Sequence, residues 1–156
     1  MLRYIYKCIL VLLLSISCVA NTTAQDDSYH HAAGIRGGLG VSGVSFKKFQ
    51  FPPTGVLEGI VGYNFNHRMI SVTGLYEYHL FLSYRMNLYA GGGLSVAFNN
   101  NDFELPIEAI IGIEYNVETF PINFSLDYKP AYRLFDKKFA FDEFALSVRY
   151  FLDGVL

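Results

Sequence analysis

The strongest constraint on the fold is a strict alternation of apolar and polar residues. It is clearest in "INFSLDYKPAYRL", from Ile122 to Leu134, where even positions are aliphatic, aromatic or proline and odd positions are mostly polar or charged. Successive side chains of a β-strand point to opposite faces, so this stretch predicts a strand with one apolar and one charged face. Two surroundings suit it. In a soluble sheet the apolar face is buried, whereas in a membrane barrel the apolar face meets lipid and the charges line the interior.

Period-two stretches of this kind recur along the chain, and no helical periodicity persists beyond a turn or two. Clusters rich in Gly, Pro, Asn and Asp separate them and supply turn chemistry. The predicted strands run over Ala32–Leu39, Gly43–Gln50, Thr54–Phe65, Met69–Leu80, Arg85–Phe98, Leu105–Asn116, Ile122–Leu134 and Glu143–Leu152.

The boundary between the first two strands is the least determined, because "GIRGGLGVSGVSFKKF" also fits one long strand. A single-chain bacterial barrel has an even number of strands, and a break at Val41 to Gly43 makes the number eight. Eight strands of about 9–11 spanning residues suit a chain of this length. We therefore predict an all-β fold, an eight-stranded antiparallel up-and-down transmembrane β-barrel.

The two faces of the predicted strands differ in a way that favours charges inside the barrel. One face, with residues such as Val61, Tyr76 and Ile111, carries no charge, whereas the other mixes charged residues with glycines. Glycines between long charged side chains suit a narrow barrel interior, which eight strands leave only wide enough for side chains to fill. The predicted polar network of the lumen comprises Arg36, Glu58, Glu77, Glu108, Glu114, Asp127, Lys129, Arg133 and Arg149.

The N-terminus has the features of a secretory signal peptide. A short basic start precedes the apolar run "CILVLLLSISCVA", which is shorter than the ~20 residues that a membrane-spanning helix needs. Cleavage is expected after Ala24, with Ala20 as the alternative, so residues 1–24 form the signal and residues 25–156 the barrel domain. Both cysteines, Cys8 and Cys18, lie in the removed segment, which excludes disulfides from the remaining chain.

Charge argues against a nucleic-acid partner. Without Arg3 and Lys7, ten of the 12 Lys and Arg residues remain, against 14 Asp and Glu residues, and a mild negative balance does not suit phosphate backbones. His30 and His31 stand beside Asp26 and Asp27, a composition that could chelate a metal loosely, but we expect them to be solvated. No metal site or cofactor is predicted.

The enzyme class stays open only as a lesser hypothesis. A site would need a nucleophile, a base and an orienting group, for example Ser71 or Ser95 with His79 and Glu77, and no motif fixes such a trio. We expect no catalytic residues, and for His79 a hydrogen bond to Glu77 or Arg85.

The chain also resembles a known family, on the stretches "GIRGG", "VTGLYEYH", "NLYAGGGLSVAF", "IGIEYNVETFPINFSLDYKPAYRL" and "FALSVRYFL". In this order they are similar to the small eight-stranded outer-membrane β-barrel proteins of the OmpX/OmpA-like kind, within the porin family of outer-membrane barrels. The resemblance implies a monomer in the bacterial outer membrane, surrounded by its lipids and inserted by the barrel-assembly machinery. A structural or loop-mediated interaction role in the cell envelope is then expected, with a small-solute channel as the alternative.

Overall fold

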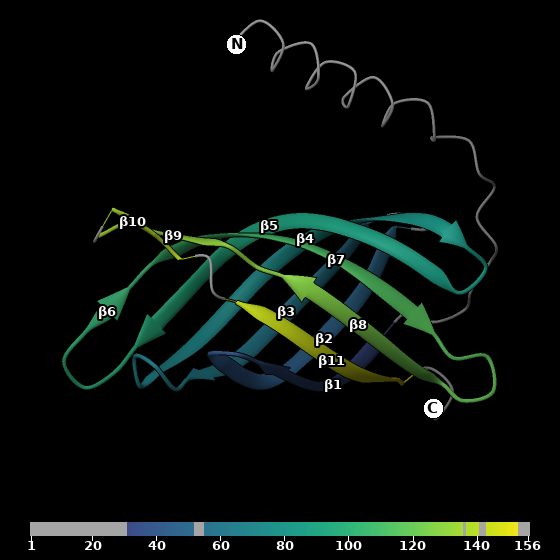
Figure 1. Cartoon of the computed structure of the whole chain (residues 1–156), viewed down its shortest axis with the longest axis horizontal. Coiled ribbons are helices and arrows are strands. Elements are labelled where there is room, and N and C mark those ends of the chain that lie inside the picture. Colours follow the sequence, from purple (N-terminus) through teal and green to yellow (C-terminus); the bar gives the residue numbers. More distant parts are fainter. Residues whose placement is uncertain (1–30, 52–54, 136, 141–142, 153–156) are drawn as a thin grey trace, which may run out of the picture.

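The structure is a computed structural model that describes residues 31–51, 55–135, 137–140 and 143–152. These residues form an all-β, eight-stranded antiparallel closed barrel (Figure 1). They contain no helix that is long and apolar enough to cross a membrane. The predicted signal peptide, residues 1–24, lies outside the described residues.

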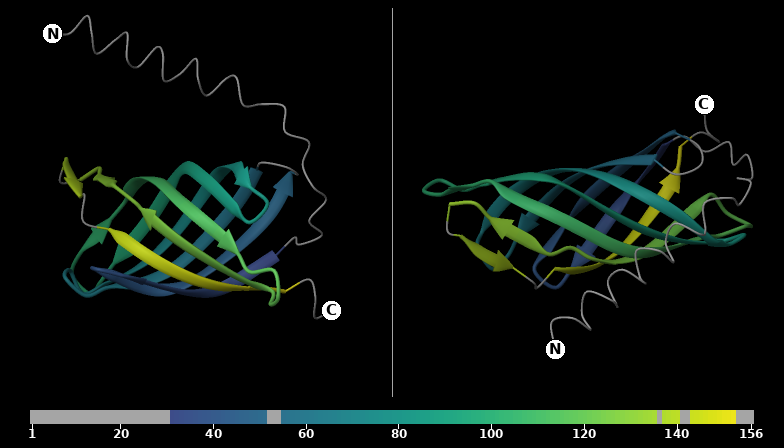
Figure 2. Two further views of the ribbon diagram at one scale, coloured as in Figure 1. Left: turned by 45° about the vertical axis from the view of Figure 1, so that its right-hand side comes forward. Right: turned by 90° about the horizontal axis from the view of Figure 1, so that it is seen from above.

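Eleven strand segments build the eight strands of the barrel, because three barrel strands are interrupted. The segments are β1 (His31–Gly38), β2 (Val41–Phe51), β3 (Gly55–Asn64), β4 (Met69–Ser83), β5 (Met86–Phe98), β6 (Phe103–Glu104), β7 (Pro106–Asn116), β8 (Ile122–Tyr128), β9 (Ala131–Arg133), β10 (Lys138–Ala140) and β11 (Phe144–Phe151). β6 and β7 both pair with β5, and β8 and β9 both pair with β7, so each of these two pairs forms one barrel strand. β10 and β11 form another, since they pair with β9 and β8, the two parts of a single strand. Antiparallel pairing of β1 with β11 closes the ring (Figure 2).

The predicted strand from Ile122 to Leu134 is broken at Lys129 and Pro130. Proline has no backbone N–H and cannot donate to the ladder. The neighbouring strands still connect across the break, because the Ala109 N–H donates to the Pro130 carbonyl and the Lys129 N–H donates to the Glu143 carbonyl.

Two predicted boundaries need correction. The first turn lies at Leu39 and Gly40, two residues before the predicted break at Val41 to Gly43. The interval between the predicted strands Ile122–Leu134 and Glu143–Leu152 contains the short strand β10, whose Lys138 pairs with Arg133 of β9. Residues 138–140 thus form a strand because they pair with the extended strand β9, although their own sequence indicates only a turn.

The two ends of the barrel differ in their connections. At the hairpin end lie the turns at residues 39–40, 65–68 and 99–102 and the turn residues 134–135 after β9, and β6, β9 and β10 extend beyond the other strands there (Figure 1). Asparagine side chains shape two of these turns. Asn64 Oδ1 accepts hydrogen bonds from the N–H groups of Asn66 and His67, and Asn99 does the same for the second and third residues after it. At the terminal end lie His31, Phe151 and the turn at Tyr84 and Arg85.

The placement of polar and apolar side chains is the reverse of that in a soluble globular protein: apolar side chains lie outside and polar ones inside. In β8, Leu126 is 55 % exposed on the outside, whereas its neighbour Asp127 is 2 % exposed inside. The outside carries large apolar residues from every barrel strand, among them Ile35, Val44, Val61, Val72, Leu94, Ile111, Phe124 and Leu146. Lys48 is a charged residue on this outward face, close to the terminal end of β2. Buried apolar side chains inside are few, and one cluster of them joins Ile60, Leu75, Tyr89 and Ile110.

Candidate functional site: the polar interior

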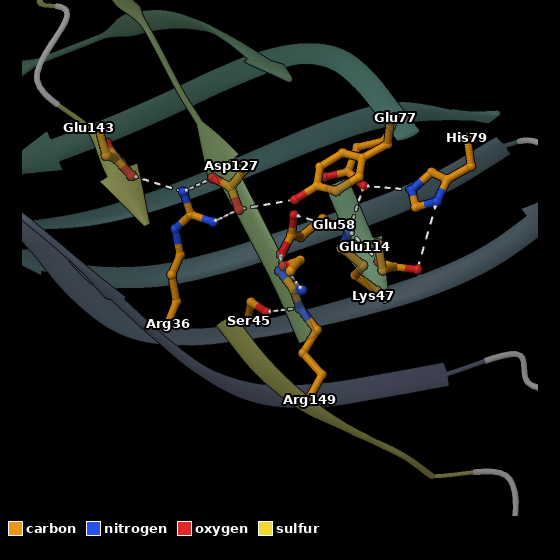
Figure 3. Close-up of polar contacts among 12 residues, drawn as sticks. Arg36, Ser45, Lys47, Glu58, Glu77, His79, Glu114, Asp127, Glu143 and Arg149 are labelled. Atoms are coloured by element: carbon orange, nitrogen blue, oxygen red, sulfur yellow. Dashed lines mark hydrogen bonds and ion pairs between the residues drawn. The ribbon is translucent and has the colours of Figure 1, made fainter. Parts of the chain in front are cut away.

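The middle of the lumen holds an ion-pair cluster around Lys47 of β2 (Figure 3). Lys47 Nζ lies 2.7 Å from Glu77 Oε2, 3.4 Å from Glu114 Oε2 and 3.9 Å from Glu58 Oε2. The three carboxylates come from β4, β7 and β3, so one ammonium group connects four strands. All four side chains are almost completely buried, and such charges are tolerated only when they are paired.

Arg149 of β11 extends this cluster to two further strands, β11 itself and β8. Its Nε donates to Ser45 Oγ at 2.6 Å, Nη1 donates to Ser125 Oγ at 2.7 Å, and Nη2 donates to Glu58 Oε1 at 2.5 Å. The rigid fork of a guanidinium can satisfy three acceptors at once, which a lysine ammonium on a flexible stem does less well. Arg149 therefore ties β11 to β2, β8 and β3 through the lumen.

A second ion pair lies nearer the hairpin end. Arg36 of β1 donates to both oxygens of Asp127, with Nη1–Oδ2 at 2.7 Å and Nη2–Oδ1 at 2.5 Å. Paired N–H···O bonds of this kind are among the strongest in proteins and fix the geometry of both partners.

Tyr89 of β5 connects the two ion-pair groups. Its hydroxyl donates to Asp127 Oδ2 at 3.0 Å, and Lys47 Nζ lies 4.2 Å from its ring centroid. The ring needs the space left by Gly112, because a Cβ at that position would lie 2.5 Å from Tyr89 Cζ. A glycine in β7 thus makes room for the largest neutral side chain of the lumen.

Towards the hairpin end the network continues through Glu143, in the break between β10 and β11. Lys129 Nζ lies 2.5 Å from Glu108 Oε2 and 3.2 Å from Glu143 Oε2, and Arg36 Nη2 lies 3.4 Å from Glu143 Oε1. Burial raises the pKa of the Glu143 carboxyl; Lys129 and Arg36 oppose the rise, and Glu108 adds to it.

A small cavity of about 60 Å³ lies beyond this layer, at the hairpin end. Lys129, Glu108 and Glu143 contribute to its lining, together with small residues such as Ser71 and Ala131. His67 and Arg133 also line it, and Arg133 Nη2 lies 2.8 Å from His67 Nε2. The volume is enough for a few water molecules.

The structure places the predicted network residues as follows. Eight lie buried in the interior, namely Arg36, Glu58, Glu77, Glu108, Glu114, Asp127, Lys129 and Arg149. Arg133 lies apart from them, partly exposed at the hairpin end, where its Nε is 3.3 Å from Glu104 Oε2. It follows the Pro130 break, which carries it beyond the packed part of the lumen. Arg85, predicted as the first residue of a strand, instead lies in the turn after β4 and pairs with Glu118.

Sequence reasoning missed several interior groups: Ser45, Lys47, Tyr89 and Glu143. Alternation within the predicted strands could have placed Lys47 inward with Ser45, and Tyr89 inward between Leu88 and Ala90. Glu143 shares the parity of Arg149 in the predicted strand Glu143–Leu152, so the same alternation could have placed it inward, although it precedes the first residue of β11. His79 was expected to bond Glu77 or Arg85, and its Nε2 lies 2.9 Å from Glu77 Oε2.

The groups considered for catalysis have other partners. Ser95 Oγ accepts from Thr73 Oγ1 at 2.9 Å and donates to the Val72 carbonyl at 3.4 Å. Within the described residues, no group of three or more His, Cys, Asp or Glu side chains is placed to hold a metal ion. The arrangement can hold strands together across the lumen.

No protein family, curated protein or solved structure matches this chain. The closed barrel and its polar interior are therefore the findings from which a function can be inferred.

Proposed function

We propose that this chain is a bacterial outer-membrane protein, exported through a cleaved signal peptide. Its eight-stranded barrel is plugged by a packed polar lumen and has a structural or loop-mediated interaction role in the cell envelope. The proposed surroundings are outer-membrane lipids, the proposed state is a monomer, and insertion depends on the barrel-assembly machinery.

The observation that carries the proposal is the apolar exterior of a barrel with a charged interior. In water, apolar side chains such as Ile35, Val61 and Leu126, each at least 49 % exposed, would contact solvent. Arginine and glutamate side chains would at the same time be buried away from it. Apolar area in water costs roughly 25 cal/mol per Å², and each buried charge adds a desolvation penalty. A lipid bilayer removes the first cost, because its acyl chains are as apolar as the exposed side chains.

The packing of the lumen supports a structural role over conduction. Arg149 of β11 with Glu58 of β3, and Arg36 of β1 with Asp127 of β8, join strands that are not neighbours in the ring, so both pairs reach through the interior at hydrogen-bonding distance. The cavity at the hairpin end is bounded by the Lys129, Glu108 and Glu143 layer. Charge-assisted pairs in a narrow interior are costly to separate, so they oppose passage of a solute.

The hairpin end supports the interaction part of the proposal. Phe103 follows the turn at residues 99–102, Phe135 lies in the turn after β9, and Phe139 lies in β10; all three are more than half exposed. Phe103 and Phe135 lie 6.1 Å apart between ring centroids. Exposed aromatic residues on short turns are suited to contact a partner or the lipid headgroup region.

Charge substitution on the outer face tests the membrane placement. In lipid vesicles, Leu126→Lys should lower the free energy of unfolding by about 2–4 kcal/mol, as a cation in the middle of a lipid-facing strand does. Phe135→Lys in the turn at the hairpin end is the control and should change it little. If the outer face met water instead, an exposed Leu126→Lys would stay within about 0.5 kcal/mol, and the membrane proposal would fail.

Planar-bilayer recordings distinguish the plugged barrel from the alternative, a small-solute channel. Pure wild-type protein should show no steady, reproducible conductance. Discrete single-channel steps, altered in size or ion selectivity by Asp127→Asn, would favour the channel and contradict the plug.

A further inference from the structure

Two cations lie directly opposite each other on the β9–β10 hairpin, at the hairpin end of the barrel. Arg133 of β9 and Lys138 of β10 are partners in the antiparallel register. Cross-strand partners share one face of a sheet, and like charges in this position destabilise the pairing. Stability therefore does not account for this pair of cations, whereas an anion bound between them would remove the repulsion.

The face that carries the two cations is turned towards the mouth of the lumen. Ala131, Arg133 and Ala140 of the same two strands line the cavity at this end, and Ala131 is the register partner of Ala140. Lys138 shares their face, because it is the partner of Arg133. Arg133 is partly exposed and Lys138 is exposed, so a ligand can reach both from outside.

The two cations meet one acid among the described residues, Glu104 of β6. Arg133 Nε lies 3.3 Å from Glu104 Oε2, and Arg133 Nη1 lies 3.5 Å from Glu104 Oε1. Both contacts are long for a charge-assisted hydrogen bond, which is usually below 3 Å. One loosely held carboxylate thus stands against two positive charges.

The hydrogen-bond donors of the two side chains also exceed their acceptors. A guanidinium has five N–H donors and an ammonium group has three, and neither accepts. Arg133 directs two of its donors at Glu104 and one at His67 Nε2, which lies 2.8 Å from Nη2. The other donors of Arg133 and those of Lys138 have no partner among the described residues. A phosphate group offers several acceptor oxygens, and arginine and lysine are the side chains that commonly bind it.

The outward face of the same hairpin is aromatic. Phe139 is 66 % exposed, is the register partner of Tyr132, and lies 4.7 Å from it between ring centroids. Aromatic residues of a membrane barrel gather where lipid headgroups meet water. In the proposed membrane placement, the two cations therefore lie close to headgroup phosphates.

We propose that Arg133 and Lys138 bind a phosphate group at the mouth of the barrel. Both side chains donate to its oxygens, and its charge balances the second cation. The phosphate belongs either to a lipid headgroup or to a free phosphate ion, because both present the same oxygens. The inference rests on the proposed function only for the lipid source.

Titration of the wild type with inorganic phosphate in dodecyl maltoside micelles tests the site, because this detergent carries no phosphate. At constant ionic strength, the ¹⁵N NMR signals of the Lys138 amide and the Arg133 side chain should shift saturably with phosphate and not with chloride. Equal shifts with both salts would mean charge screening without a site and would overturn the proposal.

Matched variants separate the site from the net charge of the protein. Lys138→Gln should weaken phosphate binding by about fivefold or more, as the loss of one exposed charge contact does. Its unfolding midpoint should not fall, because the like-charge pair is then gone. Arg85→Gln removes a positive charge at the terminal end and should bind phosphate as the wild type does. Unchanged affinity in Lys138→Gln, or an equal loss in Arg85→Gln, would contradict the site.

Phosphatidylglycerol added to the same micelles distinguishes the two sources. Shifts at Lys138 that appear with this lipid and persist in excess inorganic phosphate would assign the site to lipid headgroups. Displacement of the lipid by inorganic phosphate, or shifts with inorganic phosphate alone, would assign it to the free ion. No shift with either would overturn the proposal. Because the micelle experiment does not require membrane placement, Leu126→Lys tests that placement separately.

Discussion

At the residue scale, Arg149 provides the sharpest test of the interior network. Arg149→Ala removes the partner of buried Glu58 and the donors to Ser45 and Ser125, so we expect a loss of about 3–5 kcal/mol in the free energy of unfolding. Urea unfolding in lipid vesicles measures it. Arg85→Ala is the control, because its pair with Glu118 is exposed and should contribute no more than about 1 kcal/mol.

A double variant checks that the loss of stability comes from the Glu58 carboxylate left without its arginine partner. Adding Glu58→Gln to the Arg149→Ala variant should restore part of the stability, because the unpaired charge is then gone. Equal losses in the single and double variants would mean that the pair contributes little.

The residue scale also carries a pH prediction at Glu143. Burial raises the pKa of this carboxyl above its ordinary value of 4.5, so the folded state binds the proton more tightly than the unfolded chain. Its stabilisation is therefore complete below about pH 4.5 and lost as pH rises through the raised value. Glu143→Gln should remove this component from the pH profile of unfolding, whereas Glu118→Gln, exposed near the terminal end, should not.

The alternation of polar and apolar residues predicted whether most of these side chains point into the lumen or outward, because the period of two is a property of the strand itself. It could not predict which inward charges meet. Lys129 and Arg133 share one face of the same predicted strand, yet Pro130 lies between them and only Lys129 joins the buried network. The clustering around Lys47 depends on how three other strands are staggered, which no single stretch of sequence contains.

At the element scale, β8 allows the two faces to be compared within one strand. Leu126 is exposed outside, and Ser125 is 2 % exposed beside Arg149. In the chain without its predicted signal peptide, which has no other cysteine, Leu126→Cys carrying a fluorophore should be quenched by brominated lipids. Ser125→Cys should resist labelling by a water-soluble thiol reagent in the folded state and react after unfolding. Rapid labelling of Ser125→Cys in the folded barrel would contradict the packed lumen.

Strand boundaries were less predictable than strand faces, for a physical reason. β10 forms because β9 offers it a partner, and β4 runs on to Ser83 because it pairs with β5 through a bulge near Phe81. Both extensions depend on pairing with the other strand of the same hairpin, whereas the Asx turns after Asn64 and Asn99 are specified by the turn residues themselves and coincide with predicted breaks.

At the scale of the whole molecule, eight strands followed from parity and length, whereas closure depends on how β1 fits against β11. Gly34 faces Arg149 across this junction, and a Cβ on Gly34 would lie 1.9 Å from the Val148 carbonyl oxygen. The obstacle is backbone, which no side-chain rotation can relieve. Gly37 lies three residues further along β1, and a Cβ there would meet no atom within 4 Å.

This pair of glycines gives a matched test of closure. Gly34→Ala should force β1 away from β11, cost about 1–3 kcal/mol or more, and weaken the compact band that a folded barrel gives on unheated SDS gels. Gly37→Ala should keep that band and leave stability equal or slightly higher, since alanine in a strand loses less backbone entropy than glycine. Equal behaviour of the two variants would mean that the β1–β11 junction is not the tight contact from which the closed, plugged lumen is inferred.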